Sequence, residues 1–339
     1  MKKGWVLFLF ALLLCAVAGL WWITRPAVQL ARLSDRIATS GDIAGDSLVV
    51  IERTIVRDPV RPPAVPPFVV FAGDTIRFDR VDLRERMDRE LIAFTYSHSN
   101  SLLMLKRSTR IFPQVEPILA AKGVPDDLKY LMAIESNLSE TAVSTAGAAG
   151  LCQFMREVGR DYGLEVALTV DERFDLKKET EAACSYLKKS YAKFGDWMTV
   201  AASYNGGMNG VTRRLSTQHQ KNALDLHMVE ETSRYMFRIL VAKLFFEDPA
   251  SFGFQLEPSD YYPYIPPKRT VSVSNSIDDL AEFAGQHGIS YAELRRANPW
   301  LRDTRLVTAR GKTYAIKIPD LAAERDFCLQ QYDDNQVQE

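Results

Sequence analysis

Glu135 is a carboxyl-bearing residue on the apolar stripe of a predicted helix. The segment that leads to it begins with Pro125 and two aspartates, residue types that favour the positive N-terminal end of a helix. Leu128, Leu131 and Glu135 follow at i, i+3 and i+7, so the carboxylate shares the face that the leucines turn toward the core. Burial and the negative end of the helix dipole both raise a carboxyl pKa. Such a group acts as a general acid, and a structural glutamate paired with Arg or Lys is the alternative.

A stretch of small residues over 144–150 precedes Gln153. Glycine and alanine let the backbone pass close to another surface, and we expect a new helix to begin at this point. The amide of Gln153 would then hold a polar ligand at the start of that helix. The alternative is a glycine-rich turn before an amphipathic helix, the commoner meaning of such a stretch in isolation.

Two more segments place hydrogen-bonding side chains at helix ends. Residues 197–204 are typical of a buried helix that stops at Asn205-Gly206-Gly207. Tyr204 and Asn205 then lie at its rim, where a phenol and a carboxamide hold sugar hydroxyls without charge, although a packed tyrosine and a helix cap explain them equally.

A further helix is predicted to begin at Glu230, because two acids suit its N-terminal end. Glu231 and Tyr235 lie at i and i+4 of this helix and therefore share one face. We expect both side chains to reach the same cleft.

The composition indicates a folded globular chain without a strong charge bias. Of 339 residues, 47% are hydrophobic, and 42 Lys and Arg stand against 43 Asp and Glu. A chain of this length is long enough for one substantial core and a small second domain. The near-equal numbers of positive and negative side chains give no global electrostatic attraction to nucleic acid. The spacing of the cysteines matches no metal site, and a Cys152–Cys184 disulfide is the alternative to two buried thiols.

The N-terminal region indicates export from the cytoplasm. Residues 5–23 form an apolar run behind Lys2 and Lys3, which predicts a membrane anchor over residues 1–24 with the N-terminus inside. A cleaved signal peptide is the alternative, because Ala16-Val17-Ala18 matches a cleavage pattern. Prolines between residues 59 and 67 then predict an extended spacer over 25–80.

The rest of the chain divides by its hydrophobic pattern. Helical periodicity predicts a mainly α domain over 81–254, and prolines mark a linker over 255–268. A β-α-α-β pattern occupies 269–320, and a polar tail over 321–339 is expected to be frayed.

Four of these motifs, taken in order, resemble the catalytic domain of the soluble lytic transglycosylases, closest to the membrane-bound lytic murein transglycosylase D type. They are Glu135-Ser136, Gly150-Leu151-Cys152-Gln153-Phe154, Ser203-Tyr204-Asn205-Gly206-Gly207 and Glu231-Thr232-Ser233-Arg234-Tyr235. The resemblance implies a lysozyme-like (goose-type) α catalytic domain with a cleft for peptidoglycan strands. Cys152 stands where the family more often has Trp or Met, which affects the shape of the subsites.

The resemblance also implies a reaction. Glu135 is expected to protonate the oxygen of the β-1,4 bond between N-acetylmuramic acid and N-acetylglucosamine, and then to assist attack by the muramic acid's own 6-hydroxyl. The product carries a 1,6-anhydro end, so the enzyme is a lyase that needs no metal or organic cofactor. The residues implied to contact substrate are Ser136, Ser144, Gln153, Tyr204, Asn205 and Tyr235.

Two alternatives remain at this point. One is a muramidase that admits water to the same bond, and the other is a non-catalytic protein of the envelope that binds glycan. Typical glycosidases use two carboxylates, and the motifs supply no second catalytic acid, which favours the intramolecular attack.

The C-terminal pattern is similar to a LysM glycan-binding module. Ser274-Asn275-Ser276 replaces the usual Gly-Asp-Thr turn, so sugar binding by this module stays open. The predicted location is the periplasmic side of the cell envelope, with the membrane and peptidoglycan as the partners.

Overall fold

The computed structural model describes residues 61–336, with side chains as far as Gln330. The predicted membrane anchor or signal segment over 1–24 lies outside the described residues, and so does most of the predicted spacer. In the described part, no helix has the length and apolar character that a membrane span requires.

A β-hairpin opens the described fold. Strands β1 (Phe68–Phe71) and β2 (Asp74–Arg77) pair antiparallel through a turn at Ala72 and Gly73, which have φ angles of 51° and 92°. Alternate residues Val69, Phe71 and Ile76 are buried in the main core. The prediction of a spacer over 25–80 is therefore wrong for this hairpin, because its alternating apolar side chains belong to the core.

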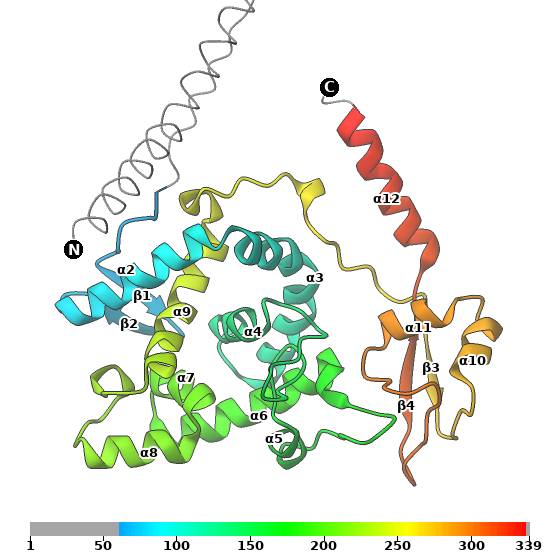
Figure 1. Cartoon of the computed structure of the whole chain (residues 1–339), viewed down its shortest axis with the longest axis horizontal. Helices are drawn as coiled ribbons and strands as arrows, with labels where there is room; N and C mark the ends of the chain where they lie inside the picture. The colour runs from blue at the N-terminus through cyan, green and yellow to red at the C-terminus, as the bar shows by residue number, and fades with distance from the viewer. Residues whose placement is uncertain (1–60, 337–339) are drawn as a thin grey trace, which may run out of the picture. The chain divides into compact units, whose positions relative to one another are not determined.

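Helices form most of the structure, and α4 lies among α3, α6, α7 and α9 in Figure 1. The α-helices of this part are α2 (Val81–Tyr96), α3 (His98–Lys122), α4 (Lys129–Ser136), α5 (Arg156–Asp161), α6 (Leu176–Phe194), α7 (Trp197–Gly206), α8 (Met208–Thr217) and α9 (Glu230–Glu247). Short 3-10 helices are η1 (Asp126–Leu128), η2 (Glu172–Phe174), η3 (Ala223–Asp225), η4 (Pro249–Phe252) and η5 (Pro258–Asp260). The mainly α class predicted from the sequence is confirmed.

Helix α4 is the central element of this arrangement. Leu128 and Leu131 are 0% and 1% exposed, as the helical periodicity predicts, and α4 packs against α3 and α9. The helix ends at Asn137, whose φ of 51° is left-handed and whose N–H donates to the carbonyl of Ala133. This short buried helix fixes the residues at its C-terminal end.

The C-terminal region has the predicted β-α-α-β order. Its elements are β3 (Arg269–Val273), α10 (Leu280–Gln286), α11 (Tyr291–Ala297) and β4 (Tyr314–Ile318), with β3 and β4 antiparallel. Its core also takes in Val170 and Phe174 from the preceding region. The N–H of Asp171 donates to the carbonyl of Trp300 at 2.9 Å, so a loop of the larger region is hydrogen-bonded to this module.

The C-terminal tail differs from its prediction. The tail expected to be frayed forms helix α12 (Leu321–Gln336), because Asp320 accepts a hydrogen bond from the N–H of Ala323 at 3.2 Å and no Pro or Gly interrupts the segment.

Cys152 and Cys184 are both buried and free, so the alternative of a disulfide between them does not hold.

Candidate active site

Glu135 lies in the last turn of α4 and is half-buried. The phenol of Tyr235, a buried residue of α9, donates a hydrogen bond to Glu135 Oε1 at 2.7 Å. Burial raises the pKa of Glu135 to about 7, while the Tyr235 hydrogen bond acts in the opposite direction. The group is therefore partly protonated at neutral pH, as its place on the leucine stripe predicts.

Two charged groups of α9 also act on Glu135. The negative charge of Glu231 raises the pKa of Glu135, and the positive charge of Arg238 lowers it. Glu231 also accepts a hydrogen bond from Asn205 Nδ2 at 3.4 Å. The expectation that Glu231 and Tyr235 approach one cleft agrees with these contacts.

Tyr204 is held against the loop that precedes α5. Its phenol donates to the carbonyl of Cys152 at 2.8 Å, and its ring makes an edge contact with Tyr186 at 5.1 Å between centroids. Burial raises the pKa of Tyr204 well above its ordinary value, with smaller contributions from Cys152 and Glu135. The phenol is therefore a neutral donor that ties α7 to this loop.

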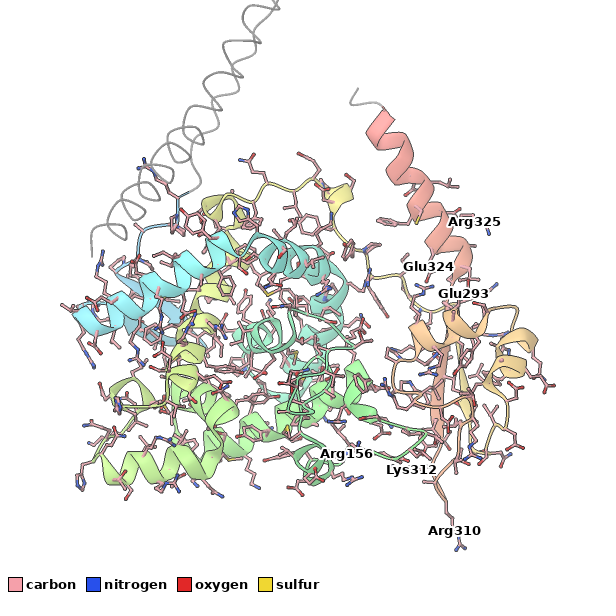
Figure 2. All side chains as sticks on the ribbon, viewed as in Figure 1. Arg156, Glu293, Arg310, Lys312, Glu324 and Arg325 are labelled. Atoms are coloured by element: carbon pink, nitrogen blue, oxygen red, sulfur yellow. The ribbon has the colours of Figure 1, made fainter. Side chains whose placement is uncertain are left out.

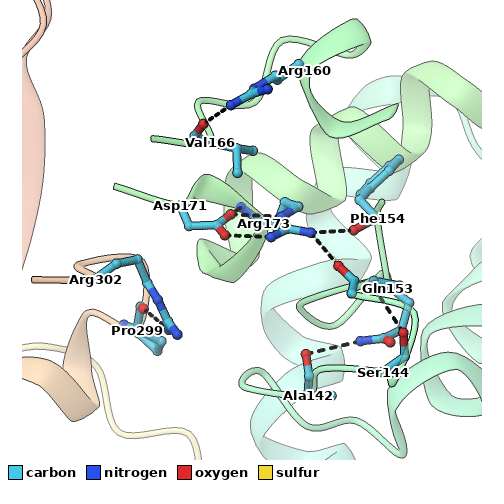
Figure 3. A network of polar contacts seen from close by, with 12 residues as sticks. Ala142, Ser144, Gln153, Phe154, Arg160, Val166, Asp171, Arg173, Pro299 and Arg302 are labelled. Carbon is cyan, nitrogen blue, oxygen red and sulfur yellow. Dashed lines mark hydrogen bonds and ion pairs between the residues drawn. The ribbon is translucent and has the colours of Figure 1, made fainter. Parts of the chain in front are cut away.

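Gln153 lies in a turn rather than on a helix, because α5 begins only at Arg156. Its φ of 51° is left-handed, which is uncommon for a residue with a side chain. Its amide Nε2 donates to the carbonyls of Gly150 at 2.7 Å and Ala142 at 3.2 Å (Figure 3). Two hydrogen bonds thus fix the orientation of the Gln153 amide.

The buried side chains of Arg173 and Glu179 hold the backbone of the loop that contains Gln153. Arg173 donates to the carbonyls of Gly147 at 2.9 Å and Phe154 at 3.0 Å, and it forms an ion pair with Asp171 at 2.7 Å (Figure 3). Glu179 accepts a hydrogen bond from the N–H of Cys152 at 2.9 Å. The loop that carries Gln153 is therefore fixed at several points of its backbone.

Gly150 lies where this loop approaches α6 and η2 most closely. A Cβ atom at this position would lie 1.6 Å from the carbonyl oxygen of Arg173 and 2.4 Å from Oε2 of Glu179. Its φ of +84° also disfavours any side chain. The glycine in the motif is thus required by close packing, as the small residues of this stretch predict.

Asn205 lies in the last turn of α7 and contacts the first turn of α9. Thr232 Oγ1 donates to Asn205 Oδ1 at 2.7 Å. Together with the bond to Glu231, this contact fixes both ends of the carboxamide.

The two predicted serines are engaged within their own segments. Ser136 Oγ donates to the carbonyl of Met132 at 3.0 Å, and the residue is 7% exposed, so its hydroxyl is turned back onto α4. Ser144 Oγ accepts a hydrogen bond from the N–H of Ala148 at 3.0 Å and lies in an exposed turn. The structure shows a local role for both hydroxyls, and their contact with substrate stays a prediction.

Sequence reasoning missed Thr232, Arg238 and Glu179. Thr232 and Arg238 lie on the same helix as Tyr235, three residues before and after it, and this helical spacing is the signal that could have found them. Glu179 lies within an ordinary amphipathic helix and offered no such signal. Among residues 61–336, no group of three or more His, Cys, Asp and Glu side chains has an arrangement suited to a metal ion.

The sequence also matches known protein families. Residues 118–226 match the family described as transglycosylase SLT domain, and residues 269–322 match the soluble lytic transglycosylase C-terminal LysM-like domain. The chain therefore carries a transglycosylase SLT domain followed by a LysM-like domain, as its motifs predict. The first match contains Glu135, Gln153, Tyr204 and Asn205.

Curated relatives agree with this assignment. The chain is 26% identical over 265 residues to membrane-bound lytic murein transglycosylase D of Escherichia coli K12, covering 75% of this chain and 56% of that protein. It is 28% identical over 101 residues to a putative tributyltin chloride resistance protein of Alteromonas sp. strain M-1, covering 30% and 49% of the two chains. The chain thus spans about half the length of the curated relatives it matches.

Two solved structures are also similar. The 70 kDa soluble lytic transglycosylase of Escherichia coli matches with a TM-score of 0.36 and 17% identity, over 44% of this chain and 26% of that one. An inactive mutant of the lytic transglycosylase Slt of Pseudomonas aeruginosa matches with a TM-score of 0.32 and 18% identity, over the same shares of 44% and 26%.

Proposed function

We propose that this protein is a peptidoglycan lytic transglycosylase that cleaves the β-1,4 bond between N-acetylmuramic acid and N-acetylglucosamine. The observation that carries the proposal is Glu135, a half-buried carboxyl with a pKa of about 7 that accepts a hydrogen bond from Tyr235. Glu135 lies within the segment that matches the transglycosylase SLT domain. In the same segment, hydrogen bonds hold the side chain of Gln153 and tie Tyr204 of α7 to the carbonyl of Cys152.

Protonation by Glu135 begins the reaction. The carboxylic acid gives its proton to the glycosidic oxygen, the bond from C1 to that oxygen breaks, and N-acetylglucosamine leaves with a free hydroxyl. Positive charge develops at C1 of N-acetylmuramic acid. A carboxyl that is protonated near neutral pH is suited to this step, because the proton is already present on the free enzyme.

The same residue then acts as a base. The Glu135 carboxylate takes the proton of the 6-hydroxyl while that oxygen bonds to C1, which closes the 1,6-anhydro ring and restores the acid. No water is consumed. Tyr235 stabilises the carboxylate form between the two steps, because its hydrogen bond favours the charged state.

A second carboxylate, Glu231, favours the alternative of a muramidase. The negative charge of Glu231 raises the pKa of Glu135. The Glu231 side chain is exposed on α9 and accepts a hydrogen bond from Asn205. A hydrolase of this kind uses one acid to protonate the leaving group and another carboxylate to activate water. The two reactions differ in their product, since the anhydro end is lighter by one water.

The remaining roles follow from the same family match. Gln153, Tyr204 and Asn205 are proposed to line the substrate cleft, with Ser136 and Ser144 at its margins. The LysM-like domain is proposed to bind glycan strands. The relative's printed name describes a membrane-bound protein, which supports a place in the cell envelope, and we propose anchoring through residues 1–24 on the periplasmic side.

Digestion of purified sacculi tests this function. The wild-type protein is expected to release muropeptides with anhydro ends, and Glu135→Gln to release almost none. Glu140→Gln is the matched control, because Glu140 is also half-buried but lies outside the Glu135 hydrogen bonds. Reducing ends in the wild-type products, or full activity of Glu135→Gln, would show that the proposal is wrong.

A further inference from the structure

The hydrophobic core of the LysM-like domain includes three side chains from the transglycosylase region. Ala149, Val170 and Phe174 are buried in one cluster with Trp300 and Leu301. This cluster is separate from the main core of the larger region. Apolar side chains are stabilised by removal from water, so these three residues depend on the LysM-like domain for that stabilisation.

Main-chain hydrogen bonds join the two regions at the same place. Residues 169–171 pair antiparallel with residues 300–302, around a bridge between Val170 and Leu301. Two N–H to carbonyl bonds of 2.9 Å flank this bridge, one donated by each segment. The pairing therefore fixes residues 169–171 relative to the LysM-like domain.

Two side-chain contacts extend this pairing to η2. The guanidinium carbon of Arg302 lies 4.2 Å from the centroid of the Phe174 ring, a cation–π distance. The carboxylate of Asp171 forms its buried ion pair with Arg173 at 2.7 Å (Figure 3). Because Arg173 and Phe174 are neighbours in η2, the contact with the LysM-like domain determines where the Arg173 guanidinium lies.

Arg173 and Ala149 carry the contact on to the Gln153 loop, which comprises residues 142–154. Arg173 donates a hydrogen bond to the carbonyl of Phe154 at 3.0 Å. Ala149, whose side chain lies in the LysM-like core, exchanges two main-chain hydrogen bonds with Phe154, at 3.0 and 3.1 Å. The residue next to Gln153 is thus connected to the LysM-like domain by packing and by hydrogen bonds.

We propose that the LysM-like domain positions the Gln153 loop of the catalytic site, with Val170 and Arg302 as positioning residues. The inference rests on the proposed function, in which Gln153 lines the substrate cleft. A domain that only tethers glycan strands adds the same binding energy to substrate and transition state, which changes KM. A domain that fixes the loop also fixes the geometry in which the glycosidic bond breaks, which changes kcat.

Hydrogen exchange of the full-length protein, measured by mass spectrometry, tests the positioning without any substrate. Val170→Ala removes two carbon atoms from the contact. The main-chain amides of residues 149–154 are then expected to exchange at least about tenfold faster, because their hydrogen bonds open more often. Val115→Ala is the matched control, since Val115 of α3 is equally buried but lies in the main core, and it should leave these amides within about twofold of the wild type.

Turnover of soluble glycan strands measures the effect on the reaction. Arg302 is exposed, so Arg302→Gln tests the contact without opening a cavity in either core. It is expected to lower kcat about fivefold and to leave KM within about twofold. Arg302→Lys keeps a cation beside the Phe174 ring and should restore most of kcat. Arg310→Gln is the control for the loss of one arginine, because Arg310 points into solvent from a loop of the LysM-like domain (Figure 2).

The outcomes separate this inference from the proposed function. Unchanged exchange of the loop amides in Val170→Ala, or equal acceleration in Val115→Ala, would overturn it. So would an Arg302→Gln protein with a normal kcat and a raised KM, because a tether alone gives that result. A wild-type protein that releases no anhydro ends would instead contradict the proposed function, and hydrogen exchange would still decide whether the LysM-like domain positions the loop.

Discussion

The phenol of Tyr235 and the carboxyl of Glu135 are 2.7 Å apart, although 100 residues separate them in the chain. The bond joins the last turn of α4 to the second turn of α9. Burial raises the pKa of Glu135 and this hydrogen bond moderates the rise. The pair thus sets the pH range in which Glu135 holds its proton.

Tyr235→Phe removes that hydrogen bond. Since the bond favours the charged form of Glu135, its loss is expected to raise the Glu135 pKa. For the wild type, kcat/KM should fall tenfold per pH unit above about 7, where the acid loses its proton. The pH profile of Tyr235→Phe should show this fall at a higher pH, and an unchanged or lower midpoint would contradict the assigned role.

Glu135→Gln is expected to stabilise the folded protein at neutral and higher pH. The folded-state pKa of about 7 exceeds the ordinary value of 4.5, so the folded state holds the proton more tightly and loses stability as pH rises through this window. The gain from Gln should grow from near zero below pH 4.5 to at most about 3 kcal/mol above pH 7. Urea unfolding at several pH values measures it, and a difference that stays constant with pH would argue against a buried, proton-holding Glu135.

Gly150→Ala is expected to prevent correct folding of the Gln153 loop. Its Cβ would lie 1.6 Å from the carbonyl oxygen of Arg173, in a backbone conformation with φ of +84°. We expect a loss of more than about 4 kcal/mol, or insoluble protein. Gly163→Ala is the matched control, because φ is +87° there and no atom lies within 4 Å of the added Cβ, so only about 1 kcal/mol of strain is expected. Similar melting temperatures for the two variants would contradict the close packing.

Thr232→Val tests the orientation of Asn205. The hydroxyl of Thr232 holds Asn205 Oδ1 at 2.7 Å, and valine keeps the shape of the side chain without the donor. We expect KM for glycan strands to rise several-fold, with a smaller change in kcat. Thr232→Ser, which keeps the hydroxyl, should restore most of the affinity. A normal KM in Thr232→Val would remove Asn205 from the substrate contacts.

Helical periodicity predicted the elements that position the candidate site. The stripe of Leu128, Leu131 and Glu135 indicated one buried face of α4, and the acids at the start of α9 marked its first turn. These are local signals, set by spacing within one segment, and the structure shows both helices where they were expected.

Other features depend on contacts between distant segments, which spacing alone does not contain. The φ of Gln153 and the bonds from Arg173 to its loop arise from tertiary packing around Gly150. The hairpin with Val69 and Phe71 was predicted to be a spacer, because the nearby prolines dominate the composition while four-residue strands give only a weak alternating signal.

The central claim is that Glu135 directs attack by the sugar's own 6-hydroxyl rather than by water. Digestion of sacculi in water enriched in heavy oxygen, followed by mass spectrometry of the muropeptides, tests it most directly. The account predicts anhydro ends that are lighter by one water and carry no heavy oxygen, and their absence in Glu135→Gln. Reducing ends that have incorporated one heavy oxygen would contradict it and identify a hydrolase.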